Sequence, residues 1–233
     1  MFDVMRGKGS LFPAGAGVIP WWMDGSPVAD TVPRRGGGDP TRNTIVLHWK
    51  EGGNMLVMDN TALLLVDIQG TLARMVHESN VVFDNWLRLI KACKLFNLPI
   101  IMLEQYSRGL GGTIPEVKEL LPDVTPIEKI TFNACLNPGF LDRLRQTGRT
   151  QLLVAGIEAH VCVYQTVSGL LAERYEVHVA SDAVSSRKPW NRQVALERMR
   201  DKGAVITTTE IALFEMMRIS DNDLFRQFIS IVK

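Results

Sequence analysis

Cysteine is scarce in this sequence, and the few cysteines follow no recognised spacing. The 233 residues contain three, Cys93, Cys135 and Cys162, without a CxxC pair. An odd number without such a pair argues against both a disulfide framework and a zinc knuckle. We therefore expect free thiols, a reducing compartment and a cytoplasmic protein.

An excess of one charge and long apolar runs are also missing. The chain has 26 lysines and arginines against 25 aspartates and glutamates, with no long run of either sign. A nucleic-acid groove or a polybasic membrane patch normally needs such an excess. The longest apolar runs are far shorter than the roughly 18 to 20 residues of a membrane span. We expect a globular protein that binds neither nucleic acid nor membrane.

Glycine and proline are concentrated at the start of the chain. Residues 1–57 hold ten of the 19 glycines and five of the 11 prolines, without helical or strand periodicity. This composition predicts a mostly disordered leader at 1–57 and a folded domain at 58–233. Prolines and glycines interrupt the apolar stretch at 11–20, which disfavours a signal peptide. Met55 and Met58 precede the first strand, so the leader also fits an expression or start-site artefact.

From residue 59 onward, short apolar runs alternate with longer amphipathic ones. This alternation predicts an α/β domain with a six-stranded, parallel, doubly wound sheet and helices on both faces. Strands are expected at 62–66, 99–103, 127–129, 151–155, 176–180 and 204–207. Helices are expected at 79–96, 114–120, 139–147, 160–175, 191–202 and 209–217. A ligand of such a sheet binds beyond the carboxyl ends of its strands.

Polar residues at those strand ends are the candidates for a site. Asp67 follows the first strand, Glu104 and Gln105 end the second, Lys129 ends the third, and the segment 156–162 follows the fourth. All are expected at one edge of the sheet. For Asp67, a turn or cap acceptor and a functional acid or base are equally good interpretations.

Cys162 is the sharpest candidate. The stretch 156–162 predicts a strand, a turn that begins at Gly156, and a helix with the thiol in its first turn. A helix dipole, exposed amides and a neighbouring Lys129 lower the pKa of a thiol placed there, and the amides can hold an oxyanion. The alternative is a small buried apolar residue, which is our interpretation of Cys93 and Cys135.

The histidines and the glycine-rich segment carry weaker signals. None of the four histidines has the spacing of a metal site. His160 begins the same helix as Cys162, but residues two apart point about 200° away from each other on a helix, which disfavours a direct dyad. The segment 109–113 lacks the ending of a phosphate loop and is interpreted as a flexible lid or pocket wall.

Three segments together resemble a known family. The segments 63–69, 129–133 and 154–163 contain Asp67, Lys129 and Cys162 in order and in matching contexts. They are similar to the isochorismatase-like cysteine hydrolases over residues 58–217. The resemblance implies a three-layer α/β/α fold and a Cys-Lys-Asp triad. Cys162 is then the nucleophile, Asp67 the general base, and Lys129 the cation that orients and stabilises the pair.

The resemblance also implies details of the site. A non-proline cis peptide is expected within 157–159, and Glu158, Ala159 and Cys162 are expected to form the oxyanion turn. The segment 103–113 has no histidine, unlike the zinc-binding nicotinamidases, and is similar to the isochorismatase-domain and YcaC-like branch. We therefore expect no metal and no cofactor. The remaining residues expected at the substrate pocket are Gln69, Glu104, Gln105, Tyr106, Phe132, His160 and Trp190.

These patterns lead to one main hypothesis and two alternatives. The main hypothesis is a cysteine hydrolase that cleaves the C–N bond of a small amide or carbamoyl compound through a thioester. The first alternative is a binding or scaffold member of the family without turnover. The second is a vinyl-ether hydrolase of isochorismatase type, which needs Asp67 but no cysteine. The family and the apolar tail at 224–232 also suggest a homo-oligomer, although the tail fits a docked helix or strand equally well.

Overall fold

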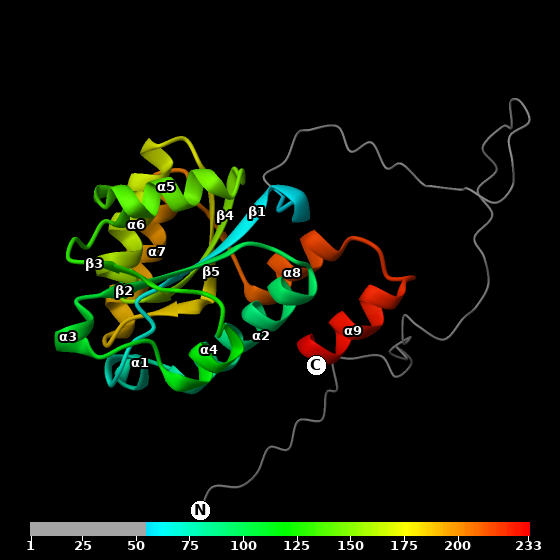
Figure 1. Ribbon diagram of the computed structural model, residues 1–233, viewed down its shortest axis with the longest axis horizontal. Coiled ribbons are helices and arrows are strands. Elements are labelled where there is room, and N and C mark those ends of the chain that lie inside the picture. Colours follow the sequence, from blue (N-terminus) through cyan, green and yellow to red (C-terminus); the bar gives the residue numbers. More distant parts are fainter. Residues whose placement is uncertain (1–54) are drawn as a thin grey trace, which may run out of the picture. The chain divides into compact units, whose positions relative to one another are not determined.

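A six-stranded parallel sheet forms the centre of the computed structural model, which describes residues 55–233. The strand order is β3-β2-β1-β4-β5-β6, so the chain starts in the middle and builds the sheet outward in both directions (Figure 1). The strands are β1 (Thr61–Val66), β2 (Ile100–Gln105), β3 (Ile127–Lys129), β4 (Gln151–Ile157), β5 (Glu176–Ser185) and β6 (Val205–Thr207). This arrangement confirms the predicted doubly wound α/β class.

Helices connect the strands and cover both faces of the sheet. The α-helices are α1 (Leu72–Met75), α2 (Ser79–Leu95), α3 (Ser107–Leu110), α4 (Pro115–Leu120), α5 (Pro138–Gln146), α6 (Tyr164–Ala172), α7 (Pro189–Asp201), α8 (Thr209–Met217) and α9 (Asp223–Val232). Two short 3₁₀ turns, η1 (Met58–Asn60) and η2 (Ala134–Leu136), and a π-helical turn, η3 (Ala159–Val163), complete the set.

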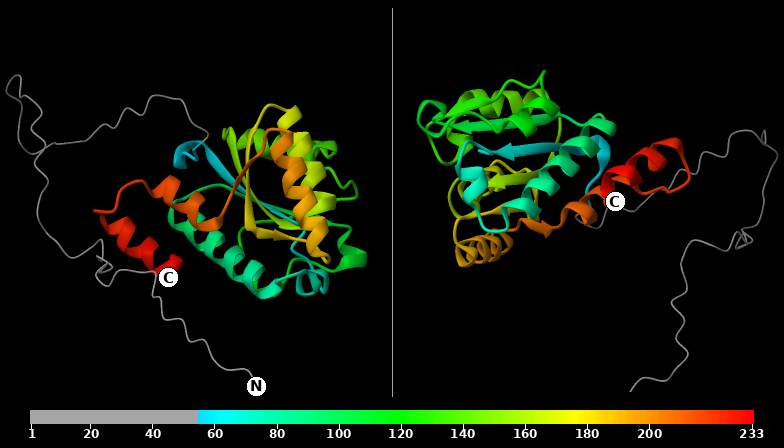
Figure 2. Two further views of the ribbon diagram at one scale, coloured as in Figure 1. Left: turned by 180° about the vertical axis from the view of Figure 1, so that it is seen from behind. Right: turned by 90° about the horizontal axis from the view of Figure 1, so that it is seen from below.

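The alternation of side chains along β1 assigns the helices to two layers. Leu63 and Leu65 pack with α2, α4, α8 and α9 in one apolar cluster. Ala62, Leu64 and Val66 pack with α5, α6 and α7 in the other. Successive side chains of a strand point to opposite faces, so a strand buried on both faces is apolar throughout. The resulting three layers are visible from two directions in Figure 2.

The helix α2 shows how one buried stripe anchors a layer. Trp86, Leu89 and Ile90 on α2 are fully buried, and the indole of Trp86 donates a 2.8 Å hydrogen bond to the carbonyl of Ala183. Burial of side chains of this size stabilises the fold by about 1.5–3 kcal/mol each. The indole bond also fixes α2 against the far end of β5.

Two element predictions were wrong in ways that matter for the site. The fifth strand was expected to end at Ala180, but β5 continues to Ser185 with a register shift against β4 between Val154 and Gly156. Polar residues within the strand conceal this continuation. The helix after β4 was expected to be α-helical from residue 160, but it begins as the π-helical turn η3.

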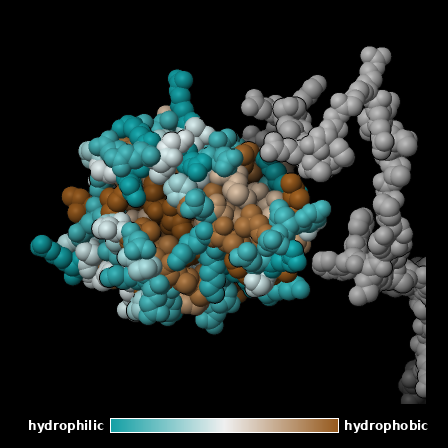
Figure 3. Space-filling view, turned by 45° about the vertical axis from the view of Figure 1, so that its right-hand side comes forward, coloured by the Kyte–Doolittle hydropathy of each residue, from teal (hydrophilic) through white to brown (hydrophobic). Residues whose placement is uncertain are grey.

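The two ends of the described chain pack against the same domain. Residues 1–54 of the predicted leader lie outside the described residues, whereas Leu56 is fully buried and its amide donates to Glu215 on α8. The apolar tail is the helix α9, which buries Phe228 beside α2 and α8. Figure 3 shows apolar surface gathered in the middle of the face that it presents, with polar residues around it. No helix within residues 55–233 is long and apolar enough to cross a membrane.

Candidate active site

Three polar side chains from different segments meet at the carboxyl edge of the sheet. β1 lies between β2 and β4, and β3 pairs with β2, so the carboxyl ends of all four strands share one edge. Asp67 follows β1, Lys129 ends β3, and Cys162 lies in η3 just after β4. Each has a relative exposure of 7% or less. The topology therefore places them at the edge where ligands of such sheets bind.

Asp67 and Lys129 form a buried ion pair. The Nζ of Lys129 donates a 2.8 Å hydrogen bond to Oδ2 of Asp67 and a 2.7 Å bond to Oε1 of Gln105. The other carboxylate oxygen of Asp67, Oδ1, is buried and accepts no hydrogen bond from the described part of the chain. A buried charge is tolerated when it is paired and hydrogen-bonded. The pair thus holds one carboxylate oxygen and leaves the other available to a neighbour.

The backbone around Asp67 is tightly constrained. Asp67 has a φ of +50°, in the left-handed region that aspartate tolerates better than most residues. On the neighbouring strand, Gly156 has a φ of +127°, and a Cβ added there would lie 2.1 Å from the carbonyl oxygen of Val66. Only glycine allows β4 to approach β1 so closely at this point. This contact aligns the ends of the two strands that present Asp67 and Cys162.

Cys162 is the neighbour of the ion pair. Burial and, after it, the negative charge of Asp67 together raise the pKa of the Cys162 thiol to about 12, and Lys129 only partly opposes them. The expectation of an acidified thiol was therefore wrong, because burial and the carboxylate outweigh the lysine. Burial also raises the pKa of Asp67, against the opposing charge of Lys129. The resting site is a neutral thiol beside a paired carboxylate.

Chemically, this arrangement places a carboxylate next to a thiol. A thiol with a raised pKa needs a base before it can act as a nucleophile, and Asp67 is the carboxylate that acts on Cys162. Of the other two thiols, Cys135 is affected by the charge of Glu173, and Cys93 is affected by burial alone. Cys93 is fully buried on α2, and Cys135 is half-buried beside Thr166; burial raises the pKa of each to about 12.

Several residues predicted for the substrate pocket instead hold the glycine-rich segment. The amide of Gln69 donates to the carbonyls of Gly111 (2.6 Å) and Gln105 (3.2 Å), and its oxygen accepts from the amide of Gln105 (2.6 Å). Glu104 accepts two 2.7 Å bonds from Thr113. A flexible lid or a pocket wall was predicted at 109–113; these bonds fix the segment along the ends of β1 and β2, which argues against the flexible lid and leaves the pocket wall as a prediction.

The other predicted pocket residues differ in what they contact. Tyr106 and Phe132 are 54% and 51% exposed, and Trp190 on α7 is 60% exposed. His160 directs its Nδ1 to the hydroxyl of Ser186 at 3.0 Å, in agreement with the expectation that it forms no dyad with Cys162. The aromatic residues that follow β2 and β3 are thus on the surface, whereas His160 links η3 to the residue that follows β5.

The turn that carries Cys162 has one feature that the resemblance predicts and one that the sequence analysis missed. The predicted feature is the cis peptide bond, which lies between Ile157 and Glu158, within 157–159. The missed feature is the contact of Glu158 with Arg187. The side chain of Glu158 is buried and accepts hydrogen bonds from the backbone amide (3.0 Å) and the Nε (3.1 Å) of Arg187. Arg187 was missed because the predicted end of the fifth strand placed it in a distant loop. In the structure it follows the end of β5 by two residues.

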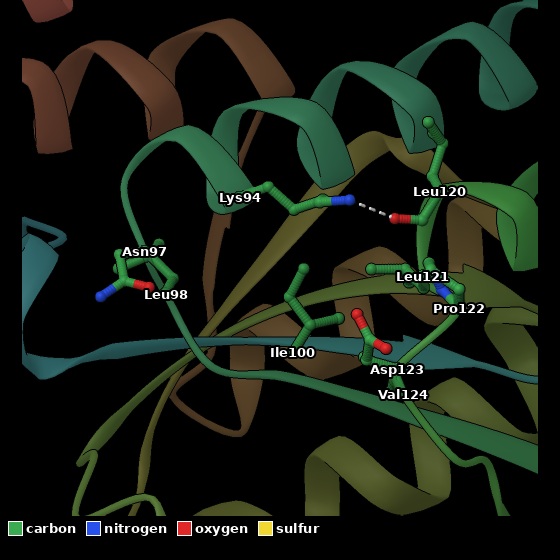
Figure 4. A pocket seen from close by; sticks show the side chains of 9 residues that line it. All are labelled: Lys94, Asn97, Leu98, Ile100, Leu120, Leu121, Pro122, Asp123 and Val124. Atoms are coloured by element: carbon green, nitrogen blue, oxygen red, sulfur yellow. Dashed lines mark hydrogen bonds between the residues drawn. The ribbon is translucent and has the colours of Figure 1, made fainter.

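Two surface hollows lie away from these residues. One, of about 240 Å³, lies between the C-terminal end of α2 and the loop after α4, with Ile100 at the amino end of β2 on its wall (Figure 4). Lys94 crosses it to donate to the carbonyl of Leu120. A second, of about 740 Å³, is lined by residues of α7 and by His77. Neither includes Asp67, Lys129 or Cys162.

Within residues 55–233, no three His, Cys, Asp or Glu side chains cluster as metal ligands would.

Comparison with known proteins gives a consistent result. The family model "Isochorismatase domain" matches residues 61–211. A solved structure described as the MAR1 ribonuclease of Caenorhabditis elegans is 36% identical, with a TM-score of 0.71 over 76% of this chain and 92% of that one. YcaC of Pseudomonas aeruginosa, solved with hexane-2,5-diol and covalent acrylamide, is 31% identical, with a TM-score of 0.73 over 76% and 90%. YcaC of Escherichia coli, described as an octameric hydrolase of unknown specificity, is 31% identical, with a TM-score of 0.72 over 78% and 94%.

Proposed function

Because the chain belongs to the isochorismatase family, we propose that it is a metal-independent cysteine hydrolase that cleaves the C–N bond of a small amide or carbamoyl compound. One observation carries the proposal. The thiol of Cys162 is buried beside the carboxylate of Asp67, which is itself held by Lys129 at 2.8 Å. A nucleophile, a base and an orienting cation at one strand edge are the parts that acyl transfer needs.

The proposed first step forms a thioester. As the sulfur of Cys162 attacks the carbonyl carbon, its proton moves to Asp67, and the electron pair of the C=O bond moves to oxygen. The backbone amides of Ala159 and Cys162 donate to that oxyanion, and each such donor contributes roughly 3–4 kcal/mol in comparable sites. Collapse breaks the C–N bond, and Asp67 returns the proton to the leaving nitrogen. Ammonia or an amine departs, and the acyl group stays on sulfur.

The proposed second step hydrolyses the thioester. Asp67 accepts a proton from water as the water oxygen attacks the acyl carbon. The C–S bond breaks, Asp67 returns its proton to the sulfur of Cys162, and a carboxylic acid is released. Lys129, hydrogen-bonded to Oδ2 of Asp67, orients the carboxylate for both proton transfers. The raised pKa of the Cys162 thiol fits this scheme, because the proton transfer accompanies attack and no free thiolate precedes it.

A solved relative supports an amide-sized substrate. The description of P. aeruginosa YcaC includes a covalent acrylamide. Acrylamide combines a small primary amide with an electrophilic alkene, so its covalent capture requires a nucleophile with room for a molecule of that size. We infer the same size class for this chain, and a substrate with few atoms beyond its acyl or carbamoyl group.

Two other activities and one assembly state need separate tests. A vinyl-ether hydrolase predicts that loss of Cys162 is harmless. Ribonuclease activity, which is named in the description of the C. elegans protein, is disfavoured by a net charge of +1, because polyanion binding depends on a cationic surface.

We also propose a homo-oligomer, since the E. coli relative is described as octameric. Light scattering at micromolar concentration tests the last point, and a monomer would refute it.

The decisive experiment measures ammonia release from formamide, acetamide, acrylamide, urea and N-carbamoylglycine by the wild-type protein and by Cys162→Ala. The proposal predicts turnover of at least one compound by the wild-type protein and none by the variant. Cys135→Ala is the matched control, because it removes a thiol on which neither Asp67 nor Lys129 acts. An RNA oligonucleotide and a vinyl ether are incubated in parallel. Equal turnover by Cys162→Ala and wild type would reject the cysteine mechanism.

A further inference from the structure

Glu158 attaches one end of the turn that carries Cys162 to the rest of the fold. Glu158 precedes η3, and its backbone carbonyl accepts hydrogen bonds from the amides of Val161 (3.0 Å) and Val163 (3.3 Å). Cys162 lies between these two residues. The position of the thiol therefore depends on where the Glu158 backbone is held.

The side chain of Glu158 supplies a second attachment, across to the next strand. It is only 8% exposed, and its Oε1 accepts from both the backbone amide and the Nε of Arg187. Ile157 and Ser185 are paired in the sheet, so Glu158 and Arg187 continue beyond the last paired residues of β4 and β5. The ion pair thus joins the two strand ends where the ladder has stopped.

The charges at this contact indicate that the carboxylate is ionised. Burial acts to raise the pKa of Glu158, but the hydrogen bonds and charge of Arg187 outweigh it and hold that pKa below its ordinary value. Hydrogen bonds between ionised groups are roughly twice as strong as neutral ones. A parallel contact from His160 to Ser186 is a single bond between a ring nitrogen and a hydroxyl. Of these two contacts, Glu158 with Arg187 and His160 with Ser186, the first is the stronger.

We propose that Glu158 is a positioning residue for the nucleophile: through its bonds to Arg187 it fixes the turn Ala159–Val163, and with it the sulfur of Cys162, against Asp67. This role rests on the proposed function and deepens it, since it assigns the Glu158 side chain to the alignment of attack. The Glu158 carboxylate does not contact the reacting atoms. Removal of this carboxylate leaves the side chains of Cys162, Asp67 and Lys129 unaltered, but the turn Ala159–Val163 is no longer held to Arg187.

A freed turn has two consequences that move in opposite directions. Turnover falls because the sulfur loses its alignment, and displacements of about 1 Å cost on the order of 100-fold in comparable enzymes. In the intact structure Cys162 is only 7% exposed. In a freed turn its sulfur is less shielded and farther from the charge of Asp67, so the rate of alkylation by iodoacetamide rises. A purely structural role of Glu158 predicts no such opposition. It predicts general loosening, in which buried Cys93 is labelled as well.

The test compares the wild-type protein with Glu158→Ala, Glu158→Gln and Arg187→Gln, with Glu116→Gln as the matched control. Glu116 also pairs with an arginine, Arg74, but on α4 and the exposed surface. Peptide mass spectrometry follows the alkylation of Cys162 and Cys93 separately, and ammonia release gives kcat and KM. We expect kcat to fall by about tenfold or more in Glu158→Ala, with KM within about twofold, and Cys162 labelling to rise at least about threefold. Cys93 is expected to stay unlabelled, and the control to match the wild-type protein.

Each result decides the proposal. Unchanged Cys162 labelling and unchanged kcat in Glu158→Ala overturn it. If Cys93 also becomes labelled in that variant, the variant has loosened globally, and Arg187→Gln decides: faster Cys162 labelling with protected Cys93 supports the proposal, and unchanged labelling overturns it. If the wild-type protein hydrolyses no amide, the proposed function fails. The alkylation rates still show whether Glu158 positions Cys162.

Discussion

The Nζ of Lys129 lies 2.8 Å from Oδ2 of Asp67, although 62 positions separate the two residues in the chain. Their contact exists because β1 and β3 are separated by only one strand, β2, and end at the same edge. Gln105, at the end of that intervening strand, accepts the second hydrogen bond of the ammonium group at 2.7 Å. Strand order thus assembles a buried charge pair and one of its supports.

Removal of one member of this pair is expected to destabilise the fold. Lys129→Met leaves the carboxylate of Asp67 buried without its cation, and the loss of one partner of a buried pair costs about 3–5 kcal/mol. Urea denaturation measures the free energy of unfolding. The double variant Asp67→Asn/Lys129→Met removes both charges and is expected to recover part of that loss. If the double variant is less stable than the sum of the two single changes predicts, the two charges are not coupled as the contact indicates.

Alkylation of Cys162 is expected to follow the charges around it. Asp67→Asn removes a charge that raises the pKa of the thiol, so labelling by iodoacetamide should become faster while turnover is lost. Lys129→Met removes the opposing cation, so labelling should become slower. Rates measured between pH 7 and 10 by peptide mass spectrometry check both directions. Slower labelling in Asp67→Asn would show that its carboxylate does not face the thiol.

The stability of the protein is expected to depend on pH through the same thiol. Folding raises the pKa of Cys162 from 9.0 to about 12, so the folded state favours the protonated form. Its contribution to stability is complete below about pH 9 and is lost as the pH rises towards 12. Cys162→Ala lacks this group and should lose less stability than the wild-type protein between pH 8 and 10. Urea denaturation at several pH values compares the two, and identical slopes would contradict the raised pKa.

The glycine-rich segment is expected to become mobile when its carboxylate support is removed. Glu104→Ala leaves the amide and hydroxyl of Thr113 without their acceptor, and an unsatisfied buried donor costs about 1–3 kcal/mol. Limited proteolysis should then cleave within 107–113 in the variant and not in the wild-type protein. Glu119→Ala on α4 is a control at a residue that makes no ion pair within the described chain. Equal resistance of the Glu104 variant and the wild-type protein would show that Gln69 and the backbone bonds of Gly70 with Gly112 and of Ile68 with Ile114 hold the segment without Glu104.

The class of fold and the candidate site residues could be predicted from the amino-acid pattern. Alternation of apolar runs with amphipathic stretches specifies a parallel sheet covered on both faces, because a strand buried on both sides must be apolar throughout. All six predicted strands exist, and the strand 127–129 was placed to the residue. Asp67 and Lys129 were identified because polar residues at the ends of buried strands are rare and the strand ends share one edge. The positions of the two residues at strand ends follow from the local pattern. Their 2.8 Å hydrogen bond depends on the order of the strands in the sheet.

The electrostatics of the thiol and the second attachment of its turn could not be predicted from local pattern, because both depend on how distant segments pack together. The pKa of Cys162 depends on how deeply it is buried and on the distance to Asp67, and local sequence encodes neither. The ion pair of Glu158 with Arg187 depends on β5 continuing to Ser185, where polar side chains interrupt the apolar pattern that marks a strand. Gln69 and Glu104 were expected at a substrate, but the folded chain directs them to its own glycine-rich segment. Local pattern fixes which groups reach the edge of the sheet, while packing in three dimensions fixes what each of them contacts.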